Sequence, residues 1–284
     1  MLRARLKTRI KSSPSLFRLA VPFVRALLVL RLARAYLTSL LRWLIFSREY
    51  TNYTYHLTEH NLRDLAHFIS ALLGTPVDEV RGYLDEVIGD SSMREHIVKR
   101  TAASPQKFSA DKEARYGRRI GWYAITRILK PAVVIESGVD KGLGTCVLAA
   151  ALLRNEREKS PGKLYALDIN PQAGWLLAPP YDRVAELVIS DSHAALGEMR
   201  EAVGLFIHDS YHAYHHEARE YELVKDLMIP GGIVISDNAH AGTALMDFAE
   251  ANGLRYHFWR ESPARHFYQG AGIGIAVMRK DAPA

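Results

Sequence analysis

A strand, a glycine-rich turn and a helix follow one another in the stretch AVVIESGVDKGLGT, residues 132–145, and this stretch constrains the fold more than any other. Residues 132–135 are a short apolar, mostly β-branched run, which predicts a strand buried on both faces. Glu136 and three glycines, Gly138, Gly142 and Gly144, come next, before an apolar segment at 146–153 that suits a helix. Glycines adopt positive φ and let the backbone approach a ligand, and a helix start offers unpaired N–H groups. The stretch therefore predicts the first half of a nucleotide-binding α/β unit.

The spacing of these residues distinguishes between cofactors. The dinucleotide fingerprint is G-x-G-x-x-G, whereas the order here is E-x-G-x-x-x-G-x-G. This order resembles the first motif of class I methyltransferases that depend on S-adenosylmethionine. The resemblance implies that Glu136, Gly138, Gly142 and Gly144 bind that cofactor. A plain strand-to-helix turn is the alternative.

Further strands are predicted after this unit, in an order that matches the same class. They lie at 163–168, 187–192, 204–209 and 233–238, with a Pro-Gly-Gly turn at 230–232, and two more candidates lie at 256–260 and 274–278. The last two are close enough in sequence to pair as an antiparallel hairpin. The resemblance covers roughly residues 111–280. It implies an α/β fold, a Rossmann-like seven-stranded methyltransferase sheet with a reversed last strand, plus an N-terminal helical extension.

Polar residues at the strand ends are the next candidates for cofactor binding. Asp168 ends the second strand about 30 residues after the glycine turn, where an acid can accept both ribose hydroxyls; a helix cap is the alternative. The resemblance implies that Asp191 and Ser192, after the third strand, meet the adenine. It also places Asp209, after the fourth strand, beside the cofactor.

Three residues that could supply oxygen ligands to a metal follow the ends of two neighbouring strands. Asp209 follows the fourth strand, and Asp237 and Asn238 follow the fifth. Hard oxygen ligands of this kind suit Mg²⁺ or Ca²⁺, with water and substrate completing the shell. The set resembles the metal triad of catechol-type O-methyltransferases, and a metal there lowers the pKa of a coordinated hydroxyl. The alternative is that Asp209 contacts only the cofactor region and that Asp237 and Asn238 cap a loop.

Histidines flank the same strand ends, and their ordinary pKa near 6.5 suits a general base. The spacing Asp209-x-x-His212 resembles the D-x-x-H of methyltransferase family 24 and of sugar O-methyltransferases of macrolide pathways. His212 is therefore the first candidate base and His240 the second. For His208, His215 and His216, an ordinary surface role is expected.

Methyl transfer is an in-line displacement at a sulfonium carbon, and a hydroxyl acceptor must also lose its proton. We expect an S-adenosylmethionine-dependent methyltransferase acting on oxygen of a hydroxylated small molecule or sugar, with assistance by Mg²⁺ left open. The rival from another class is a membrane-peripheral binding protein with a degenerate methyltransferase fold. The intact Glu136, glycines, Asp168 and Asp209 favour the enzyme.

Charge is unevenly distributed along the 284 residues. The net charge is +6, but residues 1–50 alone hold eleven Lys and Arg and one acid, Glu49. The basic character therefore belongs to the N-terminus, and a nucleic-acid partner is not expected. We predict three parts: a basic amphipathic segment at 1–50, a helical accessory region at 51–110 and the methyltransferase domain at 111–284. The expected location is cytoplasmic.

The N-terminal segment has two sections. Residues 1–11 alternate apolar and basic residues, and 23–46 are strongly apolar with Arg31, Arg34, Thr38 and Arg42 on one helical stripe. The arginines argue against a membrane-spanning helix and against a signal peptide. A basic helix lying on an anionic membrane surface, and a helix packed on the domain or on a second subunit of a homodimer, both stay open.

The helical middle is predicted from apolar residues at helical spacing. A hairpin of two helices is expected at 57–88, with Gly74 ending the first helix and Thr75 and Pro76 starting the second. It is either a substrate lid or a packing element. Residues 101–112 are predicted to be a connection, and 115–129 a helix. Its arginines, Arg115, Arg118 and Arg119, either reach an anionic ligand group or, as we expect, lie on a solvated face.

Overall fold

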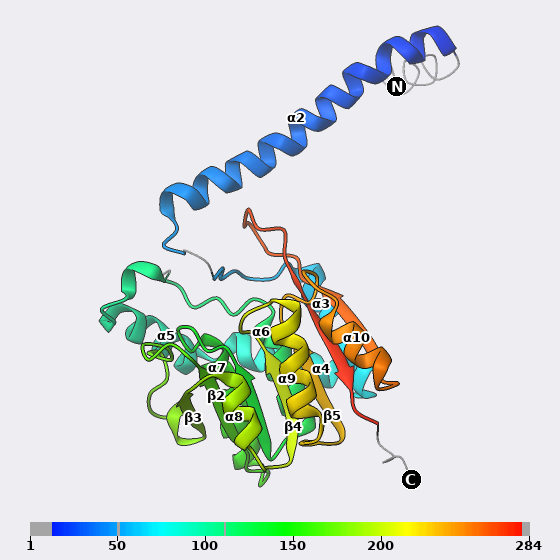
Figure 1. The fold of residues 1–284 in the computed structure, drawn as a ribbon. Coiled ribbons are helices and arrows are strands. Elements are labelled where there is room, and N and C mark those ends of the chain that lie inside the picture. The colour runs from blue at the N-terminus through cyan, green and yellow to red at the C-terminus, as the bar shows by residue number, and fades with distance from the viewer. Residues whose placement is uncertain (1–12, 50–51, 111, 280–284) are drawn as a thin grey trace. The chain divides into compact units, whose positions relative to one another are not determined.

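The computed structural model describes residues 13–49, 52–110 and 112–279 (Figure 1). These residues divide into two units. One runs to Ser47 and includes Arg265–Phe267, and the other comprises Arg48–Ala264 and the residues from Tyr268 onward. The predicted alternation of basic and apolar residues at 1–11 lies outside the described residues. The division of the chain at residues 50 and 110 stays a prediction.

A seven-stranded sheet forms the centre of the larger unit. Its strands lie side by side in the order β3-β2-β1-β4-β5-β7-β6. They are β1 (Val133–Ser137), β2 (Lys163–Asp168), β3 (Ala185–Ile189), β4 (Val203–His208), β5 (Met228–Ser236), β6 (Arg255–Arg260) and β7 (Gly272–Val277). β1 to β5 are parallel, and β7 runs antiparallel to both β5 and β6. The predicted Rossmann-like methyltransferase sheet with a reversed last strand is confirmed.

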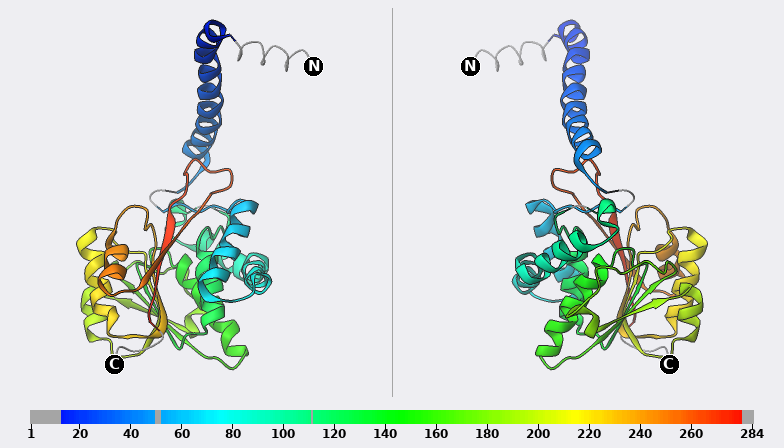
Figure 2. Two further views of the ribbon diagram at one scale, coloured as in Figure 1. Left: turned by 90° about the vertical axis from the view of Figure 1, so that its right-hand side faces the viewer. Right: turned by 90° about the vertical axis from the view of Figure 1, so that its left-hand side faces the viewer.

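Two layers of helices cover the sheet, as expected where strands are buried on both faces (Figure 2). One layer comprises α3 (Glu59–Leu73), α4 (Val77–Gly89), α5 (Ser91–Ala103), α6 (Arg119–Leu129) and α7 (Leu143–Arg157). The other comprises α8 (Ser192–Glu198), α9 (Tyr214–Lys225) and α10 (Ala244–Ala251). Alternate residues of the central strands enter the two cores. Ile135 and Phe206, for example, face the α8–α10 layer, whereas Val134 and Leu205 face the other.

The predicted helical hairpin at 57–88 is confirmed as α3 and α4, and three local details differ from expectation. α4 begins at Val77 with Pro76 as its N-cap, so Thr75 is not the cap. α6 begins at Arg119 rather than at 115, because Gly117 takes a left-handed φ of +54°. β5 begins at Met228, before the predicted turn at 230–232; the turn lies within the strand and shifts the register with β4 instead of ending the pairing.

Residues 52–58 form a strap over the start of α6 and the β6–β7 loop. The Gly117 amide donates to the carbonyl of Tyr55, and the Thr58 amide donates to the carbonyl of Ser262. Leu57 also forms an isolated antiparallel bridge with Pro263. Backbone hydrogen bonds therefore fix this strap to segments about 60 and 200 residues away in sequence.

The turn between β1 and α7 needs its glycines for two different reasons. Gly138 has φ +90°, and a Cβ built on it lies 2.3 Å from the Asp209 carbonyl oxygen. Gly142 has φ +92° and is the N-cap of α7. The Asp168 carboxylate accepts from the amides of Val139 and Asp140, both at 2.9 Å. The loop is therefore held from β2 while its backbone lies against the end of β4.

A buried polar network joins the sheet to α9. Glu220 Oε1 accepts from Ser137 Oγ at 2.6 Å, and Glu220 Oε2 lies 2.6 Å from His208 Nδ1. His208 Nε2 lies 3.3 Å from Glu217 Oε1. Burial lowers the pKa of His208, but hydrogen bonds to Glu217 and Glu220 outweigh it and raise that pKa to about 9. His208 therefore acts as a structural cation. The expected surface role is wrong for this residue, because its side chain is fully buried.

The smaller unit consists mainly of one helix, α2 (Pro14–Phe46). Sixteen of its large apolar and aromatic side chains are exposed. Its five arginines, Arg18, Arg25, Arg31, Arg34 and Arg42, are exposed as well. Among the described residues, no helix meets the length and hydropathy needed to cross a bilayer.

Substituting Gly138 is expected to break the turn between β1 and α7. Gly138→Ala places a Cβ in a left-handed conformation and against the Asp209 carbonyl, and we expect it to lower the free energy of unfolding by at least ~2 kcal/mol. Gly82→Ala is the matched control, since nothing lies within 4 Å of its Cβ in α4; it should gain up to ~1 kcal/mol. Urea unfolding measures both. Equal stability of the two variants would contradict this loop geometry.

The His208 network predicts a pH dependence of stability. The folded-state pKa of about 9 lies above the ordinary value of about 6.5, so the stabilisation is complete below pH 6.5 and is lost as the pH rises through 9. As the pH rises from 6.5 to 9.5, the wild type should therefore lose roughly 3 kcal/mol more unfolding free energy than His208→Gln. His215→Gln, an exposed neighbour, should keep the wild-type slope. Parallel slopes for wild type and His208→Gln would exclude a cationic His208.

Candidate active site at the carboxyl end of the sheet

A cleft of about 360 Å³ opens at the carboxyl ends of β1 and β4. The glycine turn forms much of its wall, and the strap contributes two side chains that sequence analysis did not identify, Asn52 and Thr54. The lining residues are Asn52, Thr54, Arg119, Glu136, Gly138, Val139, Asp140, Lys141, Leu143, Gly144 and Asp209. Of the predicted cofactor residues, Glu136, Gly138, Gly144 and Asp209 therefore share one cavity.

Glu136 lies at the bottom of this wall and is 1 % exposed. Its Oε2 accepts from Thr145 Oγ1 at 2.5 Å. Burial raises the pKa of Glu136 to about 8, against the opposing effects of Thr145 and Arg119. A Cβ on Gly144 lies 2.2 Å from Glu136 Oε1, so glycine is required for the helix start to approach this carboxyl group.

The other predicted cofactor residues lie outside the wall of this cleft. Asp168 binds the glycine turn through two backbone amides and accepts from the Asn170 amide at 2.8 Å. Asp191 is the N-cap of α8 and accepts from the Ala194 amide at 3.1 Å. Ser192 is buried, with Oγ 3.5 Å from His216 Nε2. Their cofactor roles stay predictions.

His212 has the hydrogen bonds of a general base. Its Nδ1 lies 3.1 Å from Glu217 Oε1, and its Nε2 lies 2.9 Å from Asn238 Nδ2. Asn238 Oδ1 accepts from Arg118, which turns the amide so that Nδ2 donates to His212. Nδ1 therefore carries the proton and Nε2 the lone pair, 4.0 Å from Asp209 Oδ1 at the cleft.

Glu217 was not identified from the sequence. Burial raises its pKa, but hydrogen bonds from His208 and His212 outweigh burial and hold that pKa at about 2. The signal available was its position one turn into a helix, five residues after His212. His240, the second candidate base, is exposed in the turn after β5.

Arg118 and Arg119 are buried, at 5 % and 3 % exposed, so the expected solvated face is wrong for both. The helix that they begin is buried almost all round, which forces its charged residues to pair. Arg118 binds both carboxylate oxygens of Asp237 and lies 3.2 Å from Glu261 Oε1. Arg119 Nη2 donates to Asp209 Oδ2 at 3.1 Å. Burial raises the pKa of Asp237, but Arg118 outweighs burial and the pKa is lowered.

The Arg119 side chain also has an unsatisfied donor. Its Nε is buried and has no hydrogen-bond partner among the described residues, while the side chain lines the cleft. A buried guanidinium N–H without an acceptor is costly. An oxygen of a bound ligand would satisfy it, so the cleft fits a ligand with an anionic or polar oxygen at this point.

The predicted metal ligands are brought together, but their oxygens are engaged. Ligand atoms of Asp209, His212 and Asp237 lie within 4.8 Å of one another. However, Asp209, Asp237 and Asn238 each accept a hydrogen bond from a buried arginine. This donor set does not fit a divalent cation, because binding one would place its charge beside two guanidinium groups.

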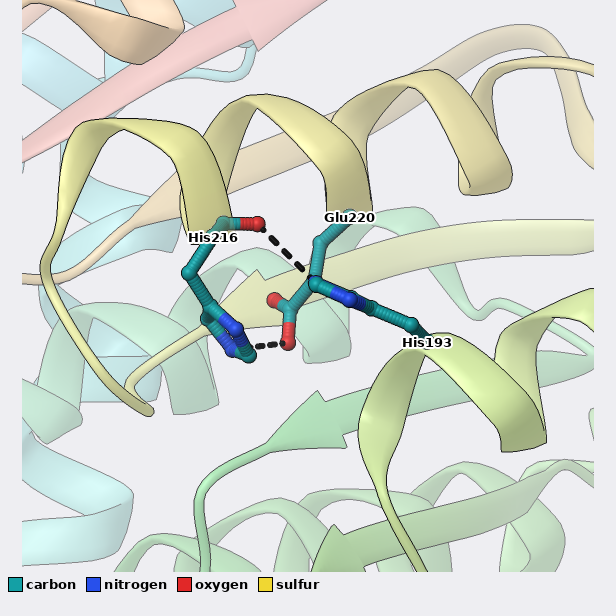
Figure 3. Close-up of side chains that lie close together, drawn as sticks. All are labelled: His193, His216 and Glu220. Atoms are coloured by element: carbon teal, nitrogen blue, oxygen red, sulfur yellow. Dashed lines mark hydrogen bonds and ion pairs between the residues drawn. The ribbon is translucent and has the colours of Figure 1, made fainter.

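A second group of potential metal ligands lies where α8 and α9 meet (Figure 3). It consists of His193, His216 and Glu220. Glu220 Oε1 lies 3.1 Å from His216 Nε2, but both of its oxygens also bind Ser137 or His208 at 2.6 Å. The carboxylate is thus committed to the buried network.

Comparisons with known proteins found one matching family model and a number of similar solved structures. Residues 135–239, from within β1 to just past β5, match the family model of a methyltransferase domain. No curated protein matches the chain. Similar solved structures include cofactor-bound Rv0187 from MTB, with 15 % identity, 79 % of this chain and 100 % of that chain covered and a TM-score of 0.48. The O-methyltransferase TomG from Streptomyces achromogenes, in complex with SAM, has 12 % identity, 78 % and 99 % coverage and a TM-score of 0.48.

The O-methyltransferase from Bacillus cereus, in complex with SAH, is similar over 76 % of this chain and 97 % of that chain, with 14 % identity and a TM-score of 0.46. At these identities and scores, the solved structures carry no argument about ligands or activity. The family match and the strand order are independent of them. Residues 135–239 match a methyltransferase domain, and the resemblance to the class I methyltransferases is confirmed for this part of the chain.

Proposed function

We propose that the domain transfers a methyl group from S-adenosylmethionine to a hydroxyl oxygen of a small molecule or sugar, with His212 as the general base. The observation that carries the proposal is the hydrogen bonding of His212. Glu217 accepts from Nδ1, and Nε2 is unprotonated, accepts from Asn238 and lies 4.0 Å from Asp209 Oδ1, a cleft residue. A carboxylate–imidazole pair in this tautomer is suited to remove a proton from a hydroxyl.

The proton movement follows from these contacts. The acceptor hydroxyl displaces the Asn238 amide from Nε2 of His212 and gives its proton to that nitrogen as its oxygen attacks. The resulting imidazolium is stabilised by Glu217, which is ionised because hydrogen bonds from His208 and His212 keep its pKa at about 2 against the effect of burial. His212 is 24 % exposed in its side chain, so it is open to a substrate, whereas His208 is not.

S-adenosylmethionine fits the cleft through the glycine turn and the orphaned Arg119 donor. When bound, it supplies an electrophilic methyl group on a sulfonium. Glu136, Gly138, Gly142, Gly144 and Asp209 are the proposed binding residues around it, and Asp168 supports the turn. Asp191 and Ser192 are proposed for the adenine end. No metal is given a step in this proposal.

The function predicts cofactor binding and a specific catalytic loss. Calorimetry should give micromolar binding of S-adenosylmethionine both with Mg²⁺ and with EDTA. With a hydroxylated acceptor, His212→Gln should lower kcat by roughly 10²–10⁴-fold while leaving cofactor affinity unchanged, because only the proton transfer is removed. His215→Gln, exposed and three residues away, is the control.

Two results would contradict the proposal. Absence of S-adenosylmethionine binding in both buffers would remove the methyltransferase function and favour a binding protein with a degenerate fold. Full kcat in His212→Gln would remove His212 as the base and promote His240.

We also propose that α2 binds an anionic lipid surface through residues 27–46. The described helix carries five arginines and no Asp or Glu, and its large apolar side chains are exposed. At 3.6 residues per turn, Arg31, Arg34 and Arg42 lie within about 80° of one another, whereas Arg18 and Arg25 lie on the opposite side. One orientation therefore places the first three at lipid headgroups and buries the opposite face, which carries Val29, Leu32 and Leu40, at the acyl boundary. The predicted homodimer and cytoplasmic location stay predictions.

Vesicle binding tests this surface. Changing Arg31, Arg34 and Arg42 together to Glu should lower partitioning onto phosphatidylserine vesicles at least ~100-fold, at about 1 kcal/mol for each arginine. Changing Arg18 and Arg25 to Glu is the control and should have a smaller effect. Sedimentation with vesicles measures both variants. Concentration-dependent dimerisation without vesicle binding would assign the helix to a second copy of the chain instead.

A further inference from the structure

We propose that the guanidinium groups of Arg118 and Arg119 take the place of a divalent cation at the ends of β4 and β5, so that the site works without a metal. The proposal deepens the proposed function, since it concerns how the same site supplies positive charge. It rests on the contacts of the buried side chains.

The first argument is that each predicted ligand already accepts from an arginine. Both carboxylate oxygens of Asp237 accept from Arg118, through Nε and Nη2. Asn238 Oδ1 accepts from Arg118 Nη2 at 3.3 Å. Asp209 Oδ2 accepts from Arg119 Nη2 at 3.1 Å. Of the side-chain oxygens of these three residues, Asp209 Oδ1 alone is not held by a guanidinium group, so a cation would find a single oxygen that no arginine engages.

The second argument is that the arginines cannot readily leave or lose charge. Their side chains are 6 % and 4 % exposed, and a guanidinium stays protonated in a protein. Arg118 is held further by Glu261 at 3.2 Å and by the Tyr55 hydroxyl at 2.9 Å. A cation that displaced Arg118 from Asp237 would leave a buried guanidinium without its main partner.

The third argument is the amount of charge. Two guanidinium groups supply the same charge as one divalent cation, beside Asp209 and Asp237. Arg119 additionally lines the cleft, so one of the two places its positive charge beside a ligand bound there. A metal ion is not needed to place positive charge there.

Direct titration with Mn²⁺ alone tests the proposal without any turnover. The full chain, cleared of metal with EDTA, is titrated and free Mn²⁺ is followed by electron paramagnetic resonance. We expect the wild type and Asp209→Asn to give the same binding curve, because Asp209 is engaged by Arg119. The proposal would be overturned if the wild type bound one equivalent of Mn²⁺ and Asp209→Asn bound it with at least tenfold lower affinity.

Variants of Arg119 and of the second histidine group complete the experiment. Arg119→Gln releases Asp209 Oδ2 and should raise Mn²⁺ affinity at least tenfold, whereas Arg119→Lys keeps the charge and should not. Equal, stoichiometric binding by the wild type and Arg119→Gln would contradict the proposal. Binding that is unchanged in Asp209→Asn but lost in His216→Ala belongs to the group in Figure 3 and leaves the proposal standing.

Failure of the proposed function is distinguishable from failure of this inference. Absence of S-adenosylmethionine binding would remove the methyltransferase function, while the Mn²⁺ curves would still report on the arginines. Where turnover is measurable, EDTA should change kcat by less than twofold. A loss of tenfold or more that Mg²⁺ restores would overturn the inference alone.

Discussion

The buried ion pair between Arg118 and Asp237 connects segments that are distant in the sequence. Arg118 precedes α6, Asp237 follows β5, and the same guanidinium binds Glu261 at the end of β6 and Tyr55 in the strap. Charges buried this deeply are stable only when paired, and removal of one partner of such a pair typically costs ~3–5 kcal/mol. This guanidinium therefore adds a buried side-chain contact to the backbone hydrogen bonds that fix the strap, and with it one wall of the cleft.

Glu217 shows how one carboxylate gives two histidines different chemistry. Its Oε1 lies 3.3 Å from His208 and 3.1 Å from His212. His208 is fully buried and binds Glu220 on its other nitrogen, which favours a permanent cation. His212 is partly exposed and accepts from the amide of Asn238 on its other nitrogen, which keeps that nitrogen unprotonated. Both histidine rings share Glu217 as one partner, so the difference in their chemistry arises from the partner of the other ring nitrogen.

Sequence analysis predicted most of what depends on local pattern. The strands, the glycine turn and the helical hairpin follow from apolar periodicity and from glycine positions, so the order of elements and the place of the cleft could be deduced. The wrong details depend on distant contacts. α6 starts late because Gly117 pairs with Tyr55, and the buried Arg118 and Arg119 pair with acids about 90 to 140 residues away. No spacing rule within a short window reports such partners.

The metal hypothesis illustrates this limit in physical terms. Two acids and an amide at neighbouring strand ends show where negative charge and oxygen gather, and a buried cluster of that kind requires a positive partner. A divalent cation and a pair of guanidinium groups both satisfy the requirement. The motif contains only the oxygen acceptors, so its residues are the same whether a cation or a pair of arginines balances their charge. The distinguishing residues, Arg118 and Arg119, begin a different helix, where their burial follows from the apolar residues around them and not from the motif they complete.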